Sequence, residues 1–223
     1  MRRPAAPCLA AGLGLRPADS PIQRRARARA CGSRGGEFCL SIGGGPRRIH
    51  PRLLNLNLAP FRNVDVVATA YALPHPDGSV PAIHCEAVVE HLEFPDRAVA
   101  EMYRVLRAGG YVYSNTPFLQ PYHAYPDHYQ NFTLTGHHRL FERAGFLVVE
   151  AGVAVGPSFM LRDLLANYCR HALPGGRWGK VLARVVELLL LPLPLLDRVT
   201  SRGATAHAVC STTYLLAQKP AEG

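Results

Sequence analysis

Side chains able to accept a proton concentrate in two stretches of this sequence. His91 follows Glu90 in "VVEHL", and "PYHAYPDHY" places His123, His128 and Tyr129 close together. A positioned imidazole, and less readily a phenol or carboxyl group, can act as a general base toward a hydroxyl or ammonium group. We therefore take His91, His123, His128 and Tyr129 as candidate catalytic residues, with Glu90 as a weaker candidate.

The second stretch also offers metal ligands. Asp127 stands between His123 and His128 in "HAYPDH", so imidazole and carboxylate groups are close in sequence. A protein metal site uses three or four such ligands, and no third one is evident beside this stretch. The sequence therefore predicts no metal site, and a purely structural role stays open for His91.

Three consecutive glycines raise the question of a cofactor. Gly43, Gly44 and Gly45 end the apolar run 37–42 and are followed by Pro-Arg-Arg. Glycines directly after a strand let the backbone approach a ligand closely. The G-x-G-x-x-G pattern of dinucleotide-binding proteins is incomplete, and no G-K-[ST] follows as in a phosphate-binding P-loop. By themselves the glycines predict either an ordinary tight turn or a cofactor turn.

The hydrophobic pattern alternates between strands and helices. Runs typical of strands occur at 37–42, 53–58, 64–70, 81–89, 111–118, 146–155 and 206–220. Helical spacing predicts helices over 95–110 and 133–146. This order predicts an α/β fold: a Rossmann-like open sheet of about seven mostly parallel strands with helices on both faces. Ligands of such sheets bind beyond the carboxyl ends of the strands, which is where the glycines stand.

Charge is unevenly distributed along the chain. Residues 1–36 contain eight arginines and one acid, whereas residues 37–223 contain 17 basic and 15 acidic residues. The Arg-rich segment 1–36 has no apolar period, which predicts a disordered tail, with an organelle-targeting segment as the alternative. The nearly neutral remainder lacks a phosphate-binding track, so we expect no nucleic acid partner. Six cysteines without a C-x-x-C pair predict thiols in a reducing, cytoplasmic environment.

Residues 157–205 interrupt the alternation. "SFMLRDLLANYCRHAL" and "GKVLARVVELLLLPLPLLDRV" predict a helical insertion before the last strand. The longest uncharged apolar run there, Leu188 to Leu196, is far shorter than the ~20 residues that a membrane-spanning helix needs. Core packing or a cover over the site is one interpretation. Peripheral membrane contact through 178–196, with Trp178 at the edge, is the other.

Four stretches, in this order and spacing, resemble the class I S-adenosylmethionine-dependent methyltransferases, in the branch called type 11. They are "LSIGGGP", "LPHPDGSV", "EAVVEHLEFPDRAVAEMYRVLRAGGYVYSNTPF" and "PYHAYPDHYQNFTLTGHHRLFERAGF". The most specific part is "VVEHL...P...A..E..RVLRAGGY". The resemblance implies a sheet whose last strand runs antiparallel, S-adenosylmethionine as cofactor, and methyl transfer from its sulfonium.

The resemblance also implies a set of cofactor-binding residues. Gly43 and Gly45 match the motif glycines, Asn57 stands at the ribose position, and Thr69 stands at the adenine position. The residues after the fourth strand would lie beside the methionine part of the cofactor. The implied cofactor-binding residues are Ser41, Gly43, Gly44, Gly45, Asn57, Leu58, Thr69, Ala70, Cys85 and Glu86.

The chain departs from the family at several acids. Ser41, Asn57, Thr69 and Pro81 stand where the family commonly has Asp or Glu. An amide or hydroxyl can still bond a ribose hydroxyl, but without the charge that strengthens the bond. The leading hypothesis is a methyltransferase domain over 37–223 that methylates a small-molecule or lipid-like acceptor. One alternative is a catalytically inactive relative that acts as a binding or scaffold protein, and another is a protein that docks on a membrane surface through 178–196; a nicotinamide-dependent oxidoreductase fits less well.

Overall fold

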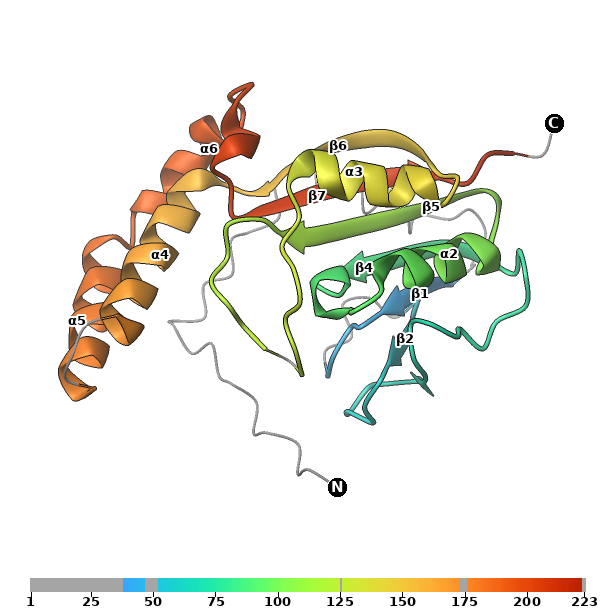
Figure 1. The fold of residues 1–223 in the computed structure, drawn as a ribbon, viewed down its shortest axis with the longest axis horizontal. Helices are drawn as coiled ribbons and strands as arrows, with labels where there is room; N and C mark the ends of the chain where they lie inside the picture. The colour runs from blue at the N-terminus through green and yellow to red at the C-terminus, as the bar shows by residue number, and fades with distance from the viewer. Residues whose placement is uncertain (1–37, 47–51, 125, 173–175, 222–223) are drawn as a thin grey trace.

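A computed structural model describes residues 38–46, 52–124, 126–172 and 176–221 (Figure 1). The tail 1–36 and its predicted disorder lie outside the described residues. The strands are β1 (Cys39–Ile42), β2 (Leu53–Asn57), β3 (Val66–Val67), β4 (Val80–Glu86), β5 (Leu106–Pro117), β6 (Leu147–Val155) and β7 (Thr212–Gln218). The α-helices are α2 (Pro95–Val105), α3 (Leu134–Arg143), α4 (Pro157–His171), α5 (Arg177–Leu189) and α6 (Asp197–Thr200). Short 3-10 helices are η2 (Val89–His91), η3 (Leu193–Leu196) and η4 (Ala206–Ala208).

The strands form one seven-stranded sheet in the order β3-β2-β1-β4-β5-β7-β6. Strands β1 to β5 pair in parallel, whereas β7 runs antiparallel between β5 and β6. Both the Rossmann-like open sheet and the antiparallel last strand are therefore confirmed. The carboxyl ends of β1, β2, β3 and β4 meet along one edge of the sheet (Figure 1).

Helices α2 and α3 pack side by side on one face of the sheet and cover the main core (Figure 1). Helix α2 starts at Pro95, and its buried side chains recur at helical spacing up to Val105. Helix α3 starts where the Thr133 side chain accepts a hydrogen bond from Gly136 N at 3.0 Å, as an N-cap does. The residues that these helices bury include Val99, Met102, Leu140 and Phe141.

Three predicted boundaries were wrong. Helix α2 ends at Val105 rather than Gly110, because the fully buried Leu106 already pairs with Val80 as the first residue of β5. Strand β4 ends at Glu86, and the predicted strand 81–89 bends there into η2. The run 64–70 contributes only the two residues of β3 to the sheet. Pairing with a neighbouring strand, rather than local propensity, decides where each strand ends.

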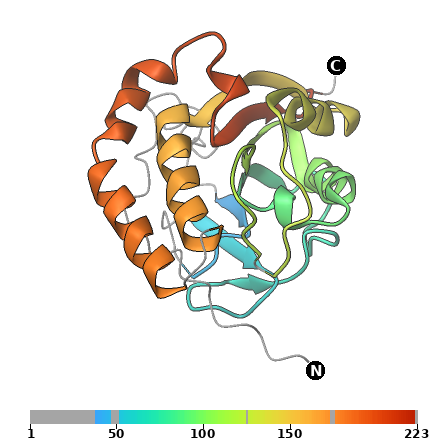
Figure 2. The same ribbon diagram turned by 60° about the vertical axis from the view of Figure 1, so that its left-hand side comes forward.

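The predicted helices of segment 157–205 are confirmed as α4 and α5. They lie side by side at the carboxyl edge of the sheet (Figure 2). Gly179 allows the close approach, because a Cβ there would lie 2.5 Å from the carbonyl oxygen of Cys169. None of the helices among the described residues is long and apolar enough to cross a membrane.

A buried histidine joins α3 to the sheet. His137 is fully buried, with Nε2 3.0 Å from Ser114 Oγ on β5 and Nδ1 3.2 Å from Thr213 Oγ1 on β7. Burial, helped by His138, lowers its pKa to about 3. The folded protein therefore holds this imidazole neutral over the range in which an unfolded histidine becomes charged.

This neutral imidazole should make stability depend on pH. Below pH 6.5 the unfolded chain binds a proton at His137 that the folded protein does not. The free energy of unfolding therefore decreases as the pH is lowered, by at most about 1.4 kcal/mol per pH unit. The variant His137→Gln lacks this titration. The wild type should exceed the variant in free energy of unfolding at neutral pH, and this excess should shrink toward about pH 5 in urea titrations. An excess that is constant with pH would contradict a buried neutral imidazole.

Candidate functional site

The glycines after β1 form a turn at the carboxyl edge of the sheet. Gly43 and Gly45 have φ angles of +72° and +61°, which glycine adopts without strain. The Gly43 N–H donates to the carbonyl oxygen of Leu56 at 2.8 Å, and a Cβ at Gly43 would collide with Val88. Other residue types are thus excluded by both conformation and space.

A side chain that sequence reasoning missed holds this turn. Asn55, on β2, is buried, and its Nδ2 donates to the carbonyl oxygens of Gly45 at 2.9 Å and Asn63 at 2.8 Å. A Cβ at Gly44 would collide with Asn55 Oδ1. The signal available in the sequence was a polar residue at the centre of the apolar run "LLNLNL".

The other predicted cofactor-binding residues lie along the same edge. Asn57 ends β2, and Thr69 follows β3; each side-chain oxygen accepts one local backbone N–H, at 3.3 Å. Glu86 ends β4, with Oε1 accepting from Asn115 Nδ2 at 3.1 Å. Ser41, Ala70 and Cys85 are buried, whereas Leu58 is exposed. The structure therefore brings these residues to the ends of four neighbouring strands.

The backbone along this edge suits S-adenosylmethionine, whereas the side chains lack the charges that would strengthen its binding. A Cβ at Gly45 would meet no atom of the described residues within 4 Å. Each oxygen of Asn57 and Thr69 retains a second lone pair for a ribose hydroxyl. The bond would be neutral instead of charge-assisted, and each such loss weakens binding by about 1–2 kcal/mol.

Three of the four candidate catalytic residues form a cluster beside this edge. His91 lies in η2, and His123 and His128 lie on the loop after β5. Their ring centroids are 5.3 Å (His91–His123), 5.8 Å (His91–His128) and 4.3 Å (His123–His128) apart. Tyr122 stacks on His128. We call His91, His123 and His128 the histidine cluster.

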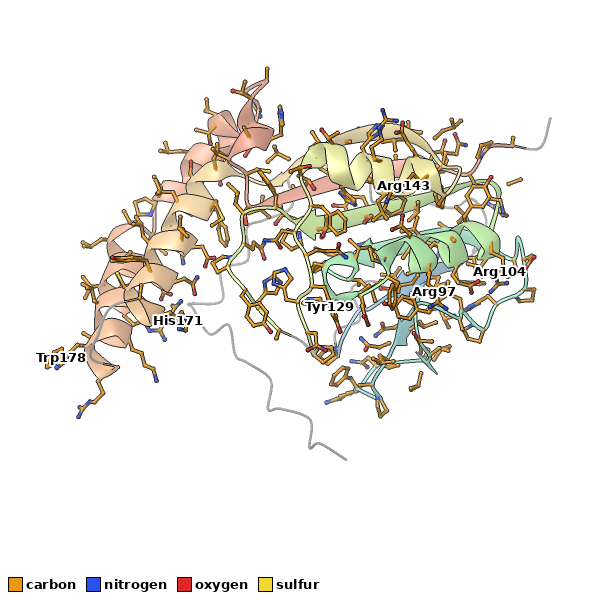
Figure 3. The ribbon with its side chains drawn as sticks, viewed as in Figure 1. Arg97, Arg104, Tyr129, Arg143, His171 and Trp178 are labelled. Atoms are coloured by element: carbon orange, nitrogen blue, oxygen red, sulfur yellow. The ribbon has the colours of Figure 1, made fainter. Side chains whose placement is uncertain are left out.

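Tyr129, the fourth candidate, contributes its backbone more than its ring. Its N–H donates to the carbonyl oxygen of Glu90 at 2.9 Å, which ties the loop to η2. The side chain is half exposed (Figure 3), and the nearby Asp127 carboxylate raises its pKa. A raised pKa makes the phenol a poorer base at neutral pH.

Hydrogen bonds fix which nitrogens of the cluster carry a proton. His91 Nδ1 lies 2.5 Å from the carbonyl oxygen of Asp127, and His123 Nδ1 lies 2.9 Å from that of Pro121. A carbonyl oxygen only accepts, so both Nδ1 atoms donate, and both Nε2 atoms keep a free lone pair in the neutral ring. Burial is the main cause that lowers the pKa of both histidines.

His128 has the opposite tautomer. Its Nδ1 accepts from the backbone N–H of His123 at 3.2 Å, so its Nε2 carries the proton and donates to Asn131 Oδ1 at 2.7 Å. Asn131 Nδ2 in turn donates to the carbonyl oxygen of Gln120, which fixes the amide orientation. Both ring nitrogens of His128 are therefore occupied, and this residue positions His123.

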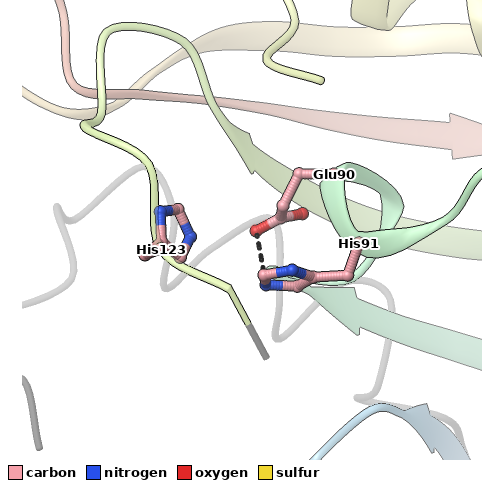
Figure 4. Close-up of side chains that lie close together, drawn as sticks. All are labelled: Glu90, His91 and His123. Atoms are coloured by element: carbon pink, nitrogen blue, oxygen red, sulfur yellow. Dashed lines mark ion pairs between the residues drawn. The ribbon is translucent and has the colours of Figure 1, made fainter. Parts of the chain in front are cut away.

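Glu90 completes the cluster (Figure 4). The side chain is fully buried; Oε2 accepts from Thr116 Oγ1 at 3.3 Å, and Oε1 lies 3.8 Å from His91 Nε2. Oε1 has no hydrogen-bond partner among the described residues. Burial is the largest cause that raises its pKa, to about 7. The sequence alone made Glu90 only a weaker candidate, because its burial is visible only in the fold.

Part of the sequence is similar to known methyltransferases. A family model described as a methyltransferase domain matches residues 49–114. An uncharacterized chloroplastic methyltransferase of Arabidopsis thaliana is 46% identical over 59 residues, which are 26% of this chain and 16% of that protein. The aligned part thus spans less than a fifth of the relative's length.

Solved structures agree in fold. A provisionally identified sarcosine dimethylglycine methyltransferase from Galdieria sulphuraria superposes with a TM-score of 0.58 at 15% identity, covering 89% of this chain and 83% of that one. Phosphoethanolamine N-methyltransferase 2 of Haemonchus contortus, in complex with S-adenosyl-L-methionine, gives a TM-score of 0.53 at 14% identity, covering 88% and 52%.

Replacing Asn55 should loosen the glycine turn. Asn55→Leu keeps the side-chain size but removes two hydrogen bonds from a buried site, so we expect a loss of about 1–3 kcal/mol in the free energy of unfolding. Asn167→Leu is the control, because that amide donates one bond within α4, to the carbonyl oxygen of Asp163. Urea titrations measure both. An equal loss in the two variants would contradict the special role of Asn55.

Proposed function

We propose that this chain, which belongs to the class I S-adenosylmethionine-dependent methyltransferase family, transfers a methyl group to a small-molecule or lipid-like acceptor. One observation carries the proposal: the glycine turn, with its positive φ angles, lies at the same sheet edge as a partly buried cluster of proton acceptors. Cofactor and acceptor would meet at this edge.

Different residues would bind the cofactor and accept the proton of the methyl acceptor. The cofactor supplies an activated methyl group on a sulfonium, so the protein mainly has to position it and the acceptor. Gly43, Gly45 and Asn57 would hold the cofactor. An Nε2 lone pair of His91 or His123 would accept the proton of an acceptor hydroxyl or ammonium group, because the Nδ1 atoms already donate to backbone carbonyls.

The class of acceptor is proposed from charge and apolar surface. Residues 37–223 are nearly neutral, with 17 basic and 15 acidic residues, which disfavours nucleic acid. Helix α4 carries Asp163, whose charge acts on His123, so this helix flanks the cluster. Leu161 and Leu164 of the same helix are exposed. The nearly neutral charge and the exposed leucines together favour a small or lipid-like acceptor.

The compartment is a proposal as well. Among the described residues, the cysteines are buried free thiols, which suits a reducing environment such as the cytoplasm. The Arabidopsis relative is named chloroplastic, and the Arg-rich segment 1–36 keeps organelle targeting as the alternative.

Cofactor binding can be tested with two matched glycine variants. Gly45 and Gly78 have φ angles of +61° and +64°, and a Cβ at either would meet no atom within 4 Å in the part of the chain that the structure describes. Alanine at either should cost the same backbone strain, about 1–2 kcal/mol. In calorimetric titrations with S-adenosylmethionine and S-adenosylhomocysteine, we expect Gly45→Ala to weaken binding about tenfold or more and Gly78→Ala to leave it unchanged.

The same titrations decide between the proposal and the inactive relative. Micromolar binding that Gly45→Ala alone weakens supports a cofactor site at the turn. A folded wild type that releases no heat at millimolar ligand would show that the replaced acids have cost the protein its cofactor. The chain would then be a catalytically inactive relative that acts as a binding or scaffold protein.

A specific surface favours membrane contact as a second function. Helix α5 packs its smallest side chains, Gly179 and Ala183, toward α4 and leaves its large apolar ones outside. Trp178 is 76% exposed and Leu189 is 72% exposed. The exposed apolar residues of α5 are Trp178, Val181, Leu182, Val185, Leu188 and Leu189. Such a stripe at helical spacing is normally buried against something.

Charge points to an anionic lipid surface as the partner. Arg177, Lys180 and Arg184 of α5 are exposed, whereas its one acid, Glu187, is buried in ion pairs with Arg170 and Arg184. Exposed basic residues beside an apolar stripe that begins with Trp are typical of helices that lie in a membrane interface.

Vesicle binding tests this surface. The wild type should co-sediment with vesicles that contain an anionic phospholipid, and Leu189→Glu should abolish this, because a charge would enter the apolar layer. Leu147→Glu is the matched control: the same substitution at a leucine on β6 that is 58% exposed. If the wild type binds neither anionic nor neutral vesicles, or if both variants lose vesicle binding equally, the proposed membrane function is wrong.

A further inference from the structure

We propose that Glu90, His91 and His123 bind a divalent transition-metal ion. One ligand atom from each of the three residues lies within 4.8 Å of the others. The residues come from η2 and from the loop after β5, so they are brought together only by the fold (Figure 4). The stretch "HAYPDH" supplies only His123, and the other two ligands come from η2.

The tautomers of His91 and His123 leave one nitrogen of each ring available to bind an ion. A histidine that binds a metal through one nitrogen usually donates the other N–H to a carbonyl or carboxylate oxygen, which orients the ring. His91 and His123 both have this arrangement, with Nδ1 donating to the carbonyl oxygens of Asp127 and Pro121. Their Nε2 lone pairs are left for an ion. His128 has both nitrogens occupied, so it supports His123 without binding the ion itself.

The buried carboxyl group is the independent observation. Glu90 is 0% exposed, and its Oε1 has no hydrogen-bond partner among the described residues. A buried, unpaired carboxylate is costly unless a cation or donor compensates it. His91 Nε2 lies 3.8 Å from Oε1. An ion between these two atoms would compensate the carboxylate and use the imidazole lone pair at once.

The distances suit an ion after a small contraction. Bonds of 2.0–2.2 Å to nitrogen and oxygen place tetrahedral ligands about 3.3 Å apart. The present spread of up to 4.8 Å would have to close by roughly 1.5 Å. His123 lies on a loop, which can move by this amount with less strain than a strand or helix.

The ligand set favours a transition metal over Mg²⁺ or Ca²⁺. Imidazole nitrogen suits Zn²⁺, Co²⁺, Fe²⁺ or Ni²⁺, whereas Mg²⁺ and Ca²⁺ prefer oxygen ligands only. Three protein ligands leave at least one position open for water or an acceptor oxygen. An acceptor hydroxyl bound there would release its proton to water more readily, because the ion stabilises the oxyanion that remains, so the ion would replace the imidazole base. That last role rests on the proposed function, whereas metal binding itself does not.

The site can be tested with Co²⁺ as a spectroscopic probe. Full-length untagged protein, stripped with a chelator and dialysed, is titrated with Co²⁺ while the visible absorption is recorded, and Zn²⁺ is then added in competition. We expect one equivalent of Co²⁺ to bind. The variants His91→Ala, His123→Ala and Glu90→Gln should each weaken binding about tenfold or more. Glu90→Gln keeps the size and an acceptor for Thr116, which guards against misfolding.

A surface histidine serves as the matched control. His138 lies on α3 beside Glu142, at 3.3 Å, so it also pairs an imidazole with a carboxylate. His138→Ala should bind Co²⁺ as the wild type does. Absence of stoichiometric binding to the folded wild type would overturn the metal site. Equal affinity in the wild type and in the three ligand variants would overturn it too, because the ion would then sit elsewhere.

Cofactor titrations on the same preparations separate this inference from the proposed function. A wild type that binds S-adenosylmethionine but no Co²⁺ would remove the metal site alone. Co²⁺ binding at the three residues without any cofactor binding would keep the metal site and remove the methyltransferase activity.

Discussion

The parallel pairing of β1 with β4 positions most of the candidate site. Leu40, Ser41 and Ile42 lie opposite Ile83, His84 and Cys85, so both strands end at the same height. The chain leaving β1 is the glycine turn, and the chain leaving β4 runs through Glu86 into η2 with Glu90 and His91. Gly43 touches Val88 at this junction, and any Cβ would push the two segments apart. The proposed cofactor and metal positions are neighbours because of this contact.

Backbone carbonyl groups decide the chemistry of the histidine cluster. The loop after β5 is tied to η2 by the Tyr129 N–H and by the carbonyl oxygen of Asp127. The second of these bonds also sets the tautomer of His91. Loop conformation and ring protonation are therefore coupled: a loop held in another way would leave different nitrogens available. This coupling is the physical basis for treating His91 and His123 as ligands or bases, and His128 as their support.

Helices α4 and α5 pack small side chains between them and expose large apolar ones, whereas most helices of a folded protein bury their large apolar side chains. Small residues and a buried ion pair hold the helices together, while leucines, valines and a tryptophan face outward. A short row of leucines and a proline lines a shallow apolar hollow at its end: Leu189, Leu190, Pro192, Leu193 and Leu196. Exposed apolar surface of this extent costs free energy in water, and the proposed membrane contact would reduce that cost.

The sequence by itself determined the order of strands and helices along the chain and the place of the glycine turn. These features depend on local periodicity and on single residues, which one sequence carries in full. It did not reveal that α2 ends at Val105, because Leu106 joins a sheet whose other strands are distant in sequence. Nor did it reveal the roles of Asn55 and Glu90. The proposed ligand set of Glu90, His91 and His123 joins residues over thirty positions apart, and a hydrogen bond across that gap fixes the free lone pair of His91. Such contacts exist only after the chain has folded, so only the tertiary structure could decide them.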